Sequence, residues 1–326
     1  MAIFIIGTIP VTKEPWRYYI ELGFQATMNE EFDLGKKIFE RIIEEDPQDP
    51  AGYFFLGVML EAEMMAKEDW ALLDSLKKLF KTSAELSKKD DNDPYALFIR
   101  GNSLGYLAIL SIKDGDYIEA LPYIRGTVGN LSKATKIKPD LYDAYIALGG
   151  YYYWKGKKLG FLNNILFLED DREKGLKYLR LASEKATFSR DIAKHSLIFA
   201  LIEEKEFDEA KRLCEYLMKK YPNSTLPLWD ALAIAEAEEN YPELVNITEK
   251  LLEKLRAEKN SNYYNIVEVL YKRAKAADKL NWYTETLNAA NEALKFELPE
   301  ETMRRQSQKV RELKELKNRL TRRGER

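Results

Sequence analysis

Residues 206–222 read EFDEAKRLCEYLMKKYP, and this stretch decides the fold. The aromatic Phe207 stands three residues before the small Ala210, and Pro222 follows Ala210 by twelve residues. Apolar residues between these positions recur at helical spacing, which predicts an amphipathic helix. A proline costs no hydrogen bond in the first turn of a helix, so Pro222 indicates where the next helix starts. The stretch therefore predicts a turn, a helix and the beginning of another helix.

The same pattern recurs along the chain, and such recurrence indicates a repeat protein. Gly35 and Pro47 are twelve residues apart, as Ala210 and Pro222 are. Leucine–glycine pairs mark another repeated position, and the first two of them are separated by 34 residues. These pairs begin at Leu22, Leu56 and Leu148. Further copies of the turn begin at Glu31, Gly115 and, in a weaker form, Trp282.

These residues resemble the tetratricopeptide repeat, a unit of two antiparallel helices. In that unit small residues let the two helices approach, an aromatic side chain packs between them, and a proline ends the unit. One pair of amphipathic helices cannot bury both of its apolar faces, so neighbouring units stack and share a core. The resemblance implies an all-α, right-handed α-solenoid of six to seven helix-turn-helix units with a C-terminal capping helix.

The resemblance extends from residue 16 to residue 298, and the two ends of the chain differ from it. We expect residues 1–15 to form an apolar strap and residues 299–326 to form a basic helix. That helix is either a cap with a solvated outer face or an amphipathic segment that contacts an acidic partner or lipid. The predicted units cover approximately 16–47, 50–93, 94–138, 142–188, 191–222, 225–259 and 262–298.

Composition limits the chemistry that this chain can perform. Of its 326 residues 45% are hydrophobic, which is enough to bury a core. Lys and Arg number 51 and Asp and Glu number 54, so the net charge of −3 predicts no nucleic-acid partner. Cys214 and His195 are the only residues of their types, so we expect no cofactor, no metal site and no catalytic centre. A run of about 18 uncharged apolar residues is missing, which predicts no transmembrane segment.

The beginning of the chain bears on its compartment. Residues 1–10 read MAIFIIGTIP, an apolar run that is short and lacks the basic start of a secretory signal. We therefore expect a cytoplasmic protein. The alternative is a periplasmic or cell-envelope location, with the beginning of a signal missing from this sequence.

Aromatic residues make up 12% of the chain and are the best candidates for partner binding. In tetratricopeptide proteins the first helices of successive units line a concave groove. The resemblance therefore implies a scaffold or adaptor that holds a partner peptide or helix in that groove through aromatic and apolar contacts. The predicted groove residues are Phe24, Phe54, Tyr95, Phe98, Asn102, Tyr106, Tyr153 and His195. The alternative for each of them is that it fills the space between helices.

A second hypothesis is a structural subunit that builds a larger complex through residues 151–171 and the C-terminal helix. Residues 151–171 read YYYWKGKKLGFLNNILFLEDD and are rich in apolar side chains for an insertion. They either fold over the fourth unit or form an exposed docking or membrane-contacting element. The predicted contact residues there are Trp154, Phe161 and Phe167. Self-association stays open at this point.

Overall fold

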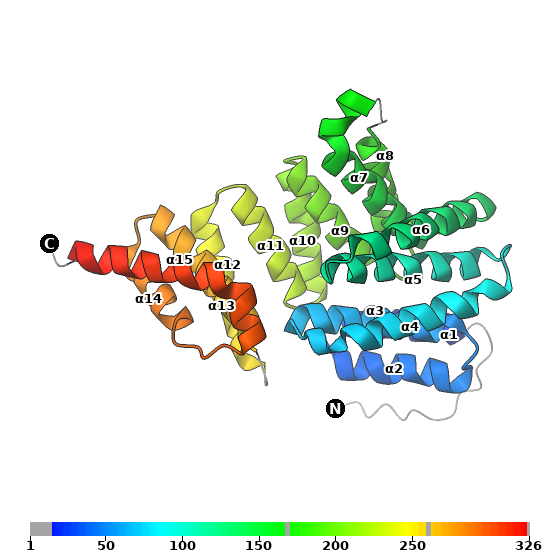
Figure 1. The fold of residues 1–326 in the computed structure, drawn as a ribbon, viewed down its shortest axis with the longest axis horizontal. Coiled ribbons are helices and arrows are strands. Elements are labelled where there is room, and N and C mark those ends of the chain that lie inside the picture. The colour runs from blue at the N-terminus through cyan, green and yellow to red at the C-terminus, as the bar shows by residue number, and fades with distance from the viewer. Residues whose placement is uncertain (1–14, 167–169, 259–261, 325–326) are drawn as a thin grey trace. The chain divides into compact units, whose positions relative to one another are not determined.

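The computed structural model describes residues 15–166, 170–258 and 262–324, and every regular element in these ranges is a helix (Figure 1). The α-helices follow one another as seven pairs and a final long helix. The pairs are α1 (Pro15–Met28) and α2 (Phe32–Glu45), α3 (Pro50–Lys67) and α4 (Leu73–Leu86), α5 (Pro94–Lys113) and α6 (Tyr117–Ile137), α7 (Tyr145–Leu166) and α8 (Arg172–Lys185), α9 (Arg190–Glu203) and α10 (Phe207–Lys220), α11 (Leu226–Ala237) and α12 (Tyr241–Ala257), and α13 (Tyr264–Lys279) and α14 (Tyr283–Ala293). The remaining elements are α15 (Glu300–Gly324) and the short 3-10 helices η1 (Trp70–Leu72), η2 (Ser87–Lys89) and η3 (Tyr142–Ala144). The predicted all-α fold of helix-turn-helix units with a C-terminal helix is confirmed.

The chain divides into two compact units. Unit 1 consists of the described residues up to Leu60 together with Ser75–Lys138. Unit 2 consists of Glu61–Asp74 and the described residues from Pro139 onward. Helix α3 therefore begins in unit 1 and ends in unit 2. The predicted strap lies outside the described residues except for its last residue, and the predicted unit boundaries stay predictions.

Six of the first helices end in the same turn, which explains the repeated sequence element. The second residue after the helix, or the first in the case of α3, adopts a left-handed conformation, and the next backbone N–H donates to the carbonyl five residues earlier. Lys205, for example, has φ 61°, and the Glu206 nitrogen lies 2.9 Å from the Leu201 oxygen. This geometry satisfies carbonyls that lack an intrahelical partner. The left-handed residues are Glu30, Glu68, Gly115, Lys205, Glu239 and Asn281.

The small residues of the pattern let paired helices approach one another. A Cβ atom on Gly23 of α1 would lie 2.3 Å from the Phe39 ring of α2, which is too close for any side chain. Gly57 of α3 stands in the same way against the Phe80 ring of α4, where the distance would be 2.8 Å. The first two leucine–glycine pairs thus mark positions where an aromatic ring packs against bare backbone.

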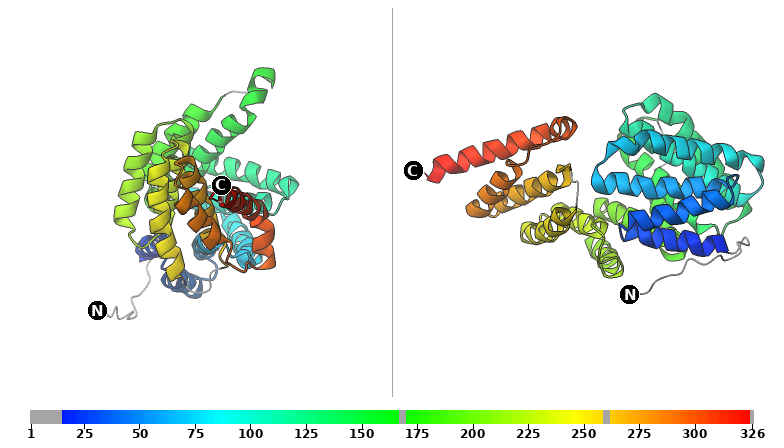
Figure 2. Two further views of the ribbon diagram at one scale, coloured as in Figure 1. Left: turned by 90° about the vertical axis from the view of Figure 1, so that its left-hand side faces the viewer. Right: turned by 90° about the horizontal axis from the view of Figure 1, so that it is seen from below.

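Helix α15 covers the end of unit 2. It packs against α13 and α14, and Figures 1 and 2 show it alongside them. Its apolar stripe, Val310, Leu313, Leu316 and Leu320, is buried, while most of its described Lys and Arg side chains are exposed. A repeat array needs such a helix because its last unit would otherwise expose an apolar face. Contact of α15 with lipid would need an exposed apolar surface, but the apolar stripe of this helix is buried.

One described helix, α5, is long and apolar enough to cross a membrane by length and composition alone, with a mean hydropathy of 1.2. The sequence predicts no transmembrane segment, whereas one helix in the described ranges passes this test of length and composition. Its composition has a structural reason in unit 1, because Leu97, Leu107 and Leu110 are buried in the core. Arg100 within the same helix forms an ion pair with Asp91 at 2.7 Å. These are the features of a core helix in a repeat protein.

Candidate functional site

Four of the predicted groove residues lie in the core. Phe24, Phe54, Phe98 and Tyr153 are each less than a tenth exposed. In unit 1 the Phe54 ring packs edge-on against the Phe98 ring, with 6.2 Å between the centroids. In unit 2 the Tyr153 hydroxyl donates to Glu204 at 2.7 Å. Where we predicted a groove surface, the structure places packing side chains, because these rings face neighbouring helices and not solvent. Their contact with a partner stays a prediction.

One exposed face of α5 carries three of the predicted residues that remain accessible. Tyr95, Asn102 and Tyr106 follow one another at intervals of seven and four residues, so they lie on one side of the helix. Ile109 continues this side, and Ile112 follows on the adjacent face at the end of α5. The exposed fractions of Tyr95, Ile109 and Ile112 lie between 39% and 51%, and the other two side chains are half-buried. We name these five residues the α5 stripe.

Packing in unit 1 fixes the middle of the α5 stripe. The Tyr106 ring lies parallel to the Phe80 ring, at 4.7 Å between centroids and an interplanar angle of 2°. Asn102 Nδ2 donates to the carbonyl of Phe98 at 2.9 Å. The stripe therefore has an ordered centre, with exposed side chains toward both ends of the helix.

The predicted groove histidine, His195 on α9, is held by a buried carboxylate. Its Nδ1 lies 2.7 Å from Oδ1 of Asp230, which is fully buried on α11. Burial by itself lowers the pKa of His195, but the charge and hydrogen bond of Asp230 outweigh burial and raise that pKa above its ordinary value. The His195 side chain remains 27% exposed, and its ring packs edge-on against Phe199 at 5.1 Å. The histidine therefore reaches the surface with an ionic partner already in place.

Cys214 lies near the same carboxylate without completing a catalytic set. Its Sγ donates to the carbonyl of Pro227 at 3.1 Å. Burial raises the pKa of the thiol to about 12, and the charge of Asp230 adds to the rise. A raised pKa favours the protonated thiol, which is less reactive than the thiolate. A group of three side chains that could hold a metal ion is also missing from the ranges that the structure describes.

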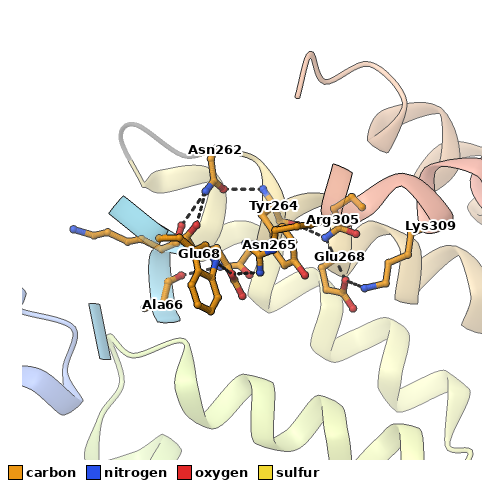
Figure 3. Close-up of polar contacts among 11 residues, drawn as sticks. Ala66, Glu68, Asn262, Tyr264, Asn265, Glu268, Arg305 and Lys309 are labelled. Carbon is orange, nitrogen blue, oxygen red and sulfur yellow. Dashed lines mark hydrogen bonds and ion pairs between the residues drawn. The ribbon is translucent and has the colours of Figure 1, made fainter. Parts of the chain in front are cut away.

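The end of α3 is held by side chains from the start of α13 (Figure 3). Asn262 Nδ2 donates to the carbonyl of Glu68 at 2.9 Å, across 194 residues of sequence. Asn265 Nδ2 donates to the carbonyl of Ala66 at 2.7 Å, across 199 residues. Carbonyls at the end of a helix lack an intrahelical donor. Two amides from far along the chain therefore complete the hydrogen bonds of this helix end.

An arginine from α15 binds the side chain of the residue that follows α3. Arg305 Nη2 lies 2.6 Å from Glu68 Oε2, which also accepts from Trp70 Nε1 at 3.0 Å. The guanidinium carbon of Arg305 lies 4.2 Å from the centroid of the Tyr264 ring and 4.9 Å from that of Trp70. Guanidinium groups combine stacking on aromatic rings with pairing to carboxylates in this way.

Gln306, next to Arg305 on α15, is fully buried. Its Nε2 donates to the carbonyl of Tyr264 at 3.2 Å, while its Oε1 has no hydrogen-bond partner among the described residues. One turn further along α15, Lys309 forms an ion pair with Glu268 of α13. We name the helix-end site by five residues: Asn262, Tyr264, Asn265, Arg305 and Gln306. Sequence reasoning missed all five, because their contacts join distant parts of the chain and no local motif marks them.

The predicted insertion residues are placed only in part. Trp154 is half-buried on α7. Phe161 belongs to α7, but its side chain lies outside what the structure describes, and Phe167 lies outside the described residues altogether. Their contact with a partner stays a prediction.

Comparison with solved structures shows what kind of fold these helices form. Human IFIT1, in a dimer with m7Gppp-AAAA, matches with a TM-score of 0.57 and 16% identity over 90% of this chain and 60% of its own. A chain of the APC/C hetero-tetramer Cut9–Hcn1 matches with a TM-score of 0.52 and 13% identity over 81% of this chain and 43% of its own. This chain thus spans less than two thirds of either protein. A TPR protein of Thermus thermophilus matches with a TM-score of 0.41 and 17% identity over 67% of this chain and 98% of its own.

The matches agree with the resemblance found in the sequence. Cut9 and IFIT1 contain tetratricopeptide repeats, and this chain has their fold. No family model matches the sequence, and no curated protein is similar to it in sequence. The chain therefore has a tetratricopeptide-like repeat fold.

Proposed function

We propose that this chain is a scaffold that binds a partner protein through the α5 stripe. The observation that carries the proposal is the exposure of tyrosine and isoleucine side chains along one face of a first helix. First helices line the concave surface of stacked repeats, and repeat proteins use such extended surfaces for binding. Exposed apolar side chains gain free energy when a partner removes water from them, so a row of them marks an interaction surface.

The length of the α5 stripe suits an elongated partner. Tyr95 and Ile112 are 17 residues apart, which corresponds to about 25 Å along an α-helix. A partner helix of about five turns, or an extended peptide, covers that length. A helix with apolar residues at intervals of three and four would place its own stripe on this one. Tyrosine is the residue type in the stripe that contributes most at protein interfaces.

Crosslinking from the α5 stripe tests the proposal. A photoreactive phenylalanine analogue at position 109, expressed in the source cells, captures the partner for identification by mass spectrometry. The affinity of the purified pair is then measured for the wild type and for the double variant Tyr95→Ala, Ile109→Ser. We expect binding to weaken by about tenfold or more, because anchors at an interface contribute on the order of 1 kcal/mol or more each.

Leu34 supplies a matched control for this measurement. It is an exposed leucine on α2, outside the α5 stripe. Leu34→Ser should change the affinity by less than about twofold, because isolated surface substitutions have small effects. An affinity that stays the same in the stripe variant would show that the partner binds elsewhere.

A second candidate function, a subunit of a larger assembly, is favoured by an apolar patch on α6. Tyr117, Ile118 and Leu121 are between 60% and 82% exposed, more than most large apolar residues at a protein surface. Residues 151–171, which the sequence predicts as a contact region, lie elsewhere in the chain, so this patch is an additional surface for assembly. Light scattering on the wild type and on Ile118→Glu tests it. A complex that persists in the variant would contradict assembly through α6.

We expect the partner to be a protein. A nucleic acid is the alternative partner with which this fold is compatible. The IFIT1 structure contains m7Gppp-AAAA, so a repeat fold of this kind is compatible with binding RNA. The small negative net charge of this chain still argues against an RNA partner. A gel-shift assay with capped and uncapped oligonucleotides decides between the two classes.

A further inference from the structure

The helix-end site binds backbone groups that every α-helix presents. Asn262 and Asn265 donate to carbonyls at the end of α3 and not to its side chains. The last carbonyls of any α-helix lack an intrahelical donor. The two amides would therefore satisfy the end of another helix as well as they satisfy the end of α3.

Arg305 adds a requirement for a carboxylate. Its guanidinium lies against the Tyr264 ring, and its acidic partner is Glu68, the first residue after α3. Trp70, two residues further, adds a second ring beside the guanidinium and a second donor to the same carboxylate oxygen. The ligand chemistry of the site is thus a helix end followed by an acidic and then an aromatic residue.

The segment that fills the site is held mainly by polar contacts. Glu68 has φ 52°, a left-handed conformation that favours glycine over other residues. The side chains of 65–70 are exposed or half-buried, so few apolar contacts hold them. Gln306 keeps a buried oxygen without a partner in the described part of the chain, which lowers the stability of this arrangement.

We propose that the helix-end site is a receptor for the C-terminal end of an acidic helix, and that residues 61–74 occupy it as an intramolecular ligand. An external helix of the same chemistry competes with this segment. Because the segment is tethered, its effective concentration is high, and only a partner that binds well displaces it. This inference goes beyond the α5 stripe, which shares no residue with the helix-end site, so either can fail without the other.

A labelled peptide tests the proposal on the full-length chain. The probe carries the sequence of residues 61–72, EAEMMAKEDWAL, behind a short alanine–lysine helix, with both termini blocked. The chain is opened by Glu68→Lys together with Trp70→Ala, which removes the carboxylate and the ring from the site. We expect the opened chain to bind the probe about tenfold more tightly than the wild type, or better, because the intramolecular competitor is weakened.

Variants of the probe and of the receptor identify the contacts. A probe carrying Glu68→Gln should bind the opened chain about tenfold more weakly, because a charge-assisted hydrogen bond is lost. Adding Arg305→Ala to the opened chain should weaken binding by a similar factor. Arg304→Ala is the matched control, since Arg304 is the preceding residue of α15 and is exposed, and it should leave the affinity unchanged.

Two results would overturn the proposal. One is equal affinity of the wild-type and opened chains for the probe, and the other is a probe affinity that ignores Glu68→Gln. If the opened chain loses its helical circular dichroism, Glu68→Gln in the chain replaces it, with the same order of affinities expected. Hydrogen exchange in that variant must also show faster exchange at residues 65–70, and unchanged protection there counts against the proposal.

Discussion

Unit 1 buries clusters of aromatic rings, whereas unit 2 adds buried carboxylates to an aliphatic core. In unit 1 the rings of Phe39 and Phe55 stack at 5.9 Å, and those of Phe80 and Tyr106 at 4.7 Å. In unit 2 buried carboxylates join helices and loops that are far apart in sequence. These carboxylates are Asp143, Asp191 and Asp230. The same repeat fold therefore accepts two different kinds of interior.

Asp143 and Asp191 are buried together with their partners, whereas Asp230 is paired through Oδ1 and its Oδ2 has no hydrogen-bond partner among the described residues. Asp143 accepts the backbone N–H groups of Thr187, Phe188 and Ser189, each at 2.9 Å, and so orders the loop between α8 and α9. A buried charge without partners is costly, but one that is fully hydrogen-bonded fixes the geometry around it. The difference between the units teaches that ring packing tolerates changes of pH, while a charge network depends on the protonation of its members.

Phe80→Ala should have the largest effect and break the interior of unit 1. Phe80 is fully buried and contacts Phe54, Tyr106 and the bare backbone of Gly57. Removing a buried ring costs about 4 kcal/mol through lost burial and the cavity that remains. Hydrogen exchange should show faster opening of α3, α4 and α5.

An exposed aromatic residue controls for this variant. Tyr117→Ala on α6 should change the free energy of unfolding by less than about 0.5 kcal/mol, because Tyr117 is mostly exposed. Equal losses for the two variants would contradict the view that ring packing holds unit 1.

Asp191→Ala should break unit 2 by a different mechanism, at a cost of about 3 kcal/mol. Asp191 accepts from Lys194 at 3.0 Å, Lys220 at 2.6 Å and the Tyr221 hydroxyl at 2.6 Å. The substitution leaves Lys194 buried without its counter-charge. Thermal unfolding and hydrogen exchange of α9 and α10 measure the loss. Asp208→Ala, an exposed acid in the first turn of α10, should cost less than about 1 kcal/mol, and a similar cost at both sites would refute the role of burial.

Changing the pH near neutrality should separate the two units further. The pKa of His195 is raised because Asp230 outweighs the opposing effect of burial. A raised pKa in the folded state gives stabilisation that is fully present below about pH 6.5 and is lost as the pH rises through the folded value. We expect α9 and α11 to open more readily at pH 9 than at pH 6, by less than Asp191→Ala causes.

His195 is the only histidine, so its contribution can be isolated. In His195→Gln the difference between pH 6 and pH 9 should disappear from α9 and α11, once exchange is corrected for its intrinsic dependence on pH. A difference that persists in this variant would assign the pH effect to other groups.

Glycine at the shared turn should have the smallest effect and sharpen the comparison. Lys205 and Glu30 occupy the same left-handed position in units 2 and 1, where Gly115 has φ 86°. Lys205→Gly and Glu30→Gly should each stabilise the chain by about 0.5–1 kcal/mol, because they relieve the left-handed backbone at some cost in chain entropy. Thermal unfolding measures both. Equal gains would show that the units differ in their interiors and share their turns, and a loss in either unit would contradict this.

The helices and turns could be predicted because their causes are local. An aromatic residue three positions before a small one, and a proline twelve residues later, encode a turn and a helix wherever they occur. The turn copies at Glu31, Gly115 and Trp282 begin one residue after, or at, a left-handed position of the structure. The turns at Glu68 and Glu239 also have an aromatic residue two positions later, but the small residue of the pattern is replaced there by Leu73 and Leu244, which weakens the sequence signal.

The candidate sites were less predictable because they depend on which side of a helix faces solvent. Counting along α5 found Tyr95, Asn102 and Tyr106, and the same spacing extended by three and six residues would have found Ile109 and Ile112. The burial of Phe24, Phe54, Phe98 and Tyr153 depends on neighbouring helices that their own spacing does not specify. The contacts of Asn262 and Asn265 join residues nearly 200 positions apart, and such pairs leave no periodic trace.

The shared left-handed turn has a consequence for how such chains diverge. Glutamate, lysine, asparagine and glycine all occupy it here, and each closes its helix with the same backbone hydrogen bond. Because backbone atoms make the turn, a mutation can change the residue type at this position without changing the course of the backbone. Related proteins can in this way replace most of their residues and keep the same fold. Their structures then remain similar after the similarity of their sequences has become too low to detect.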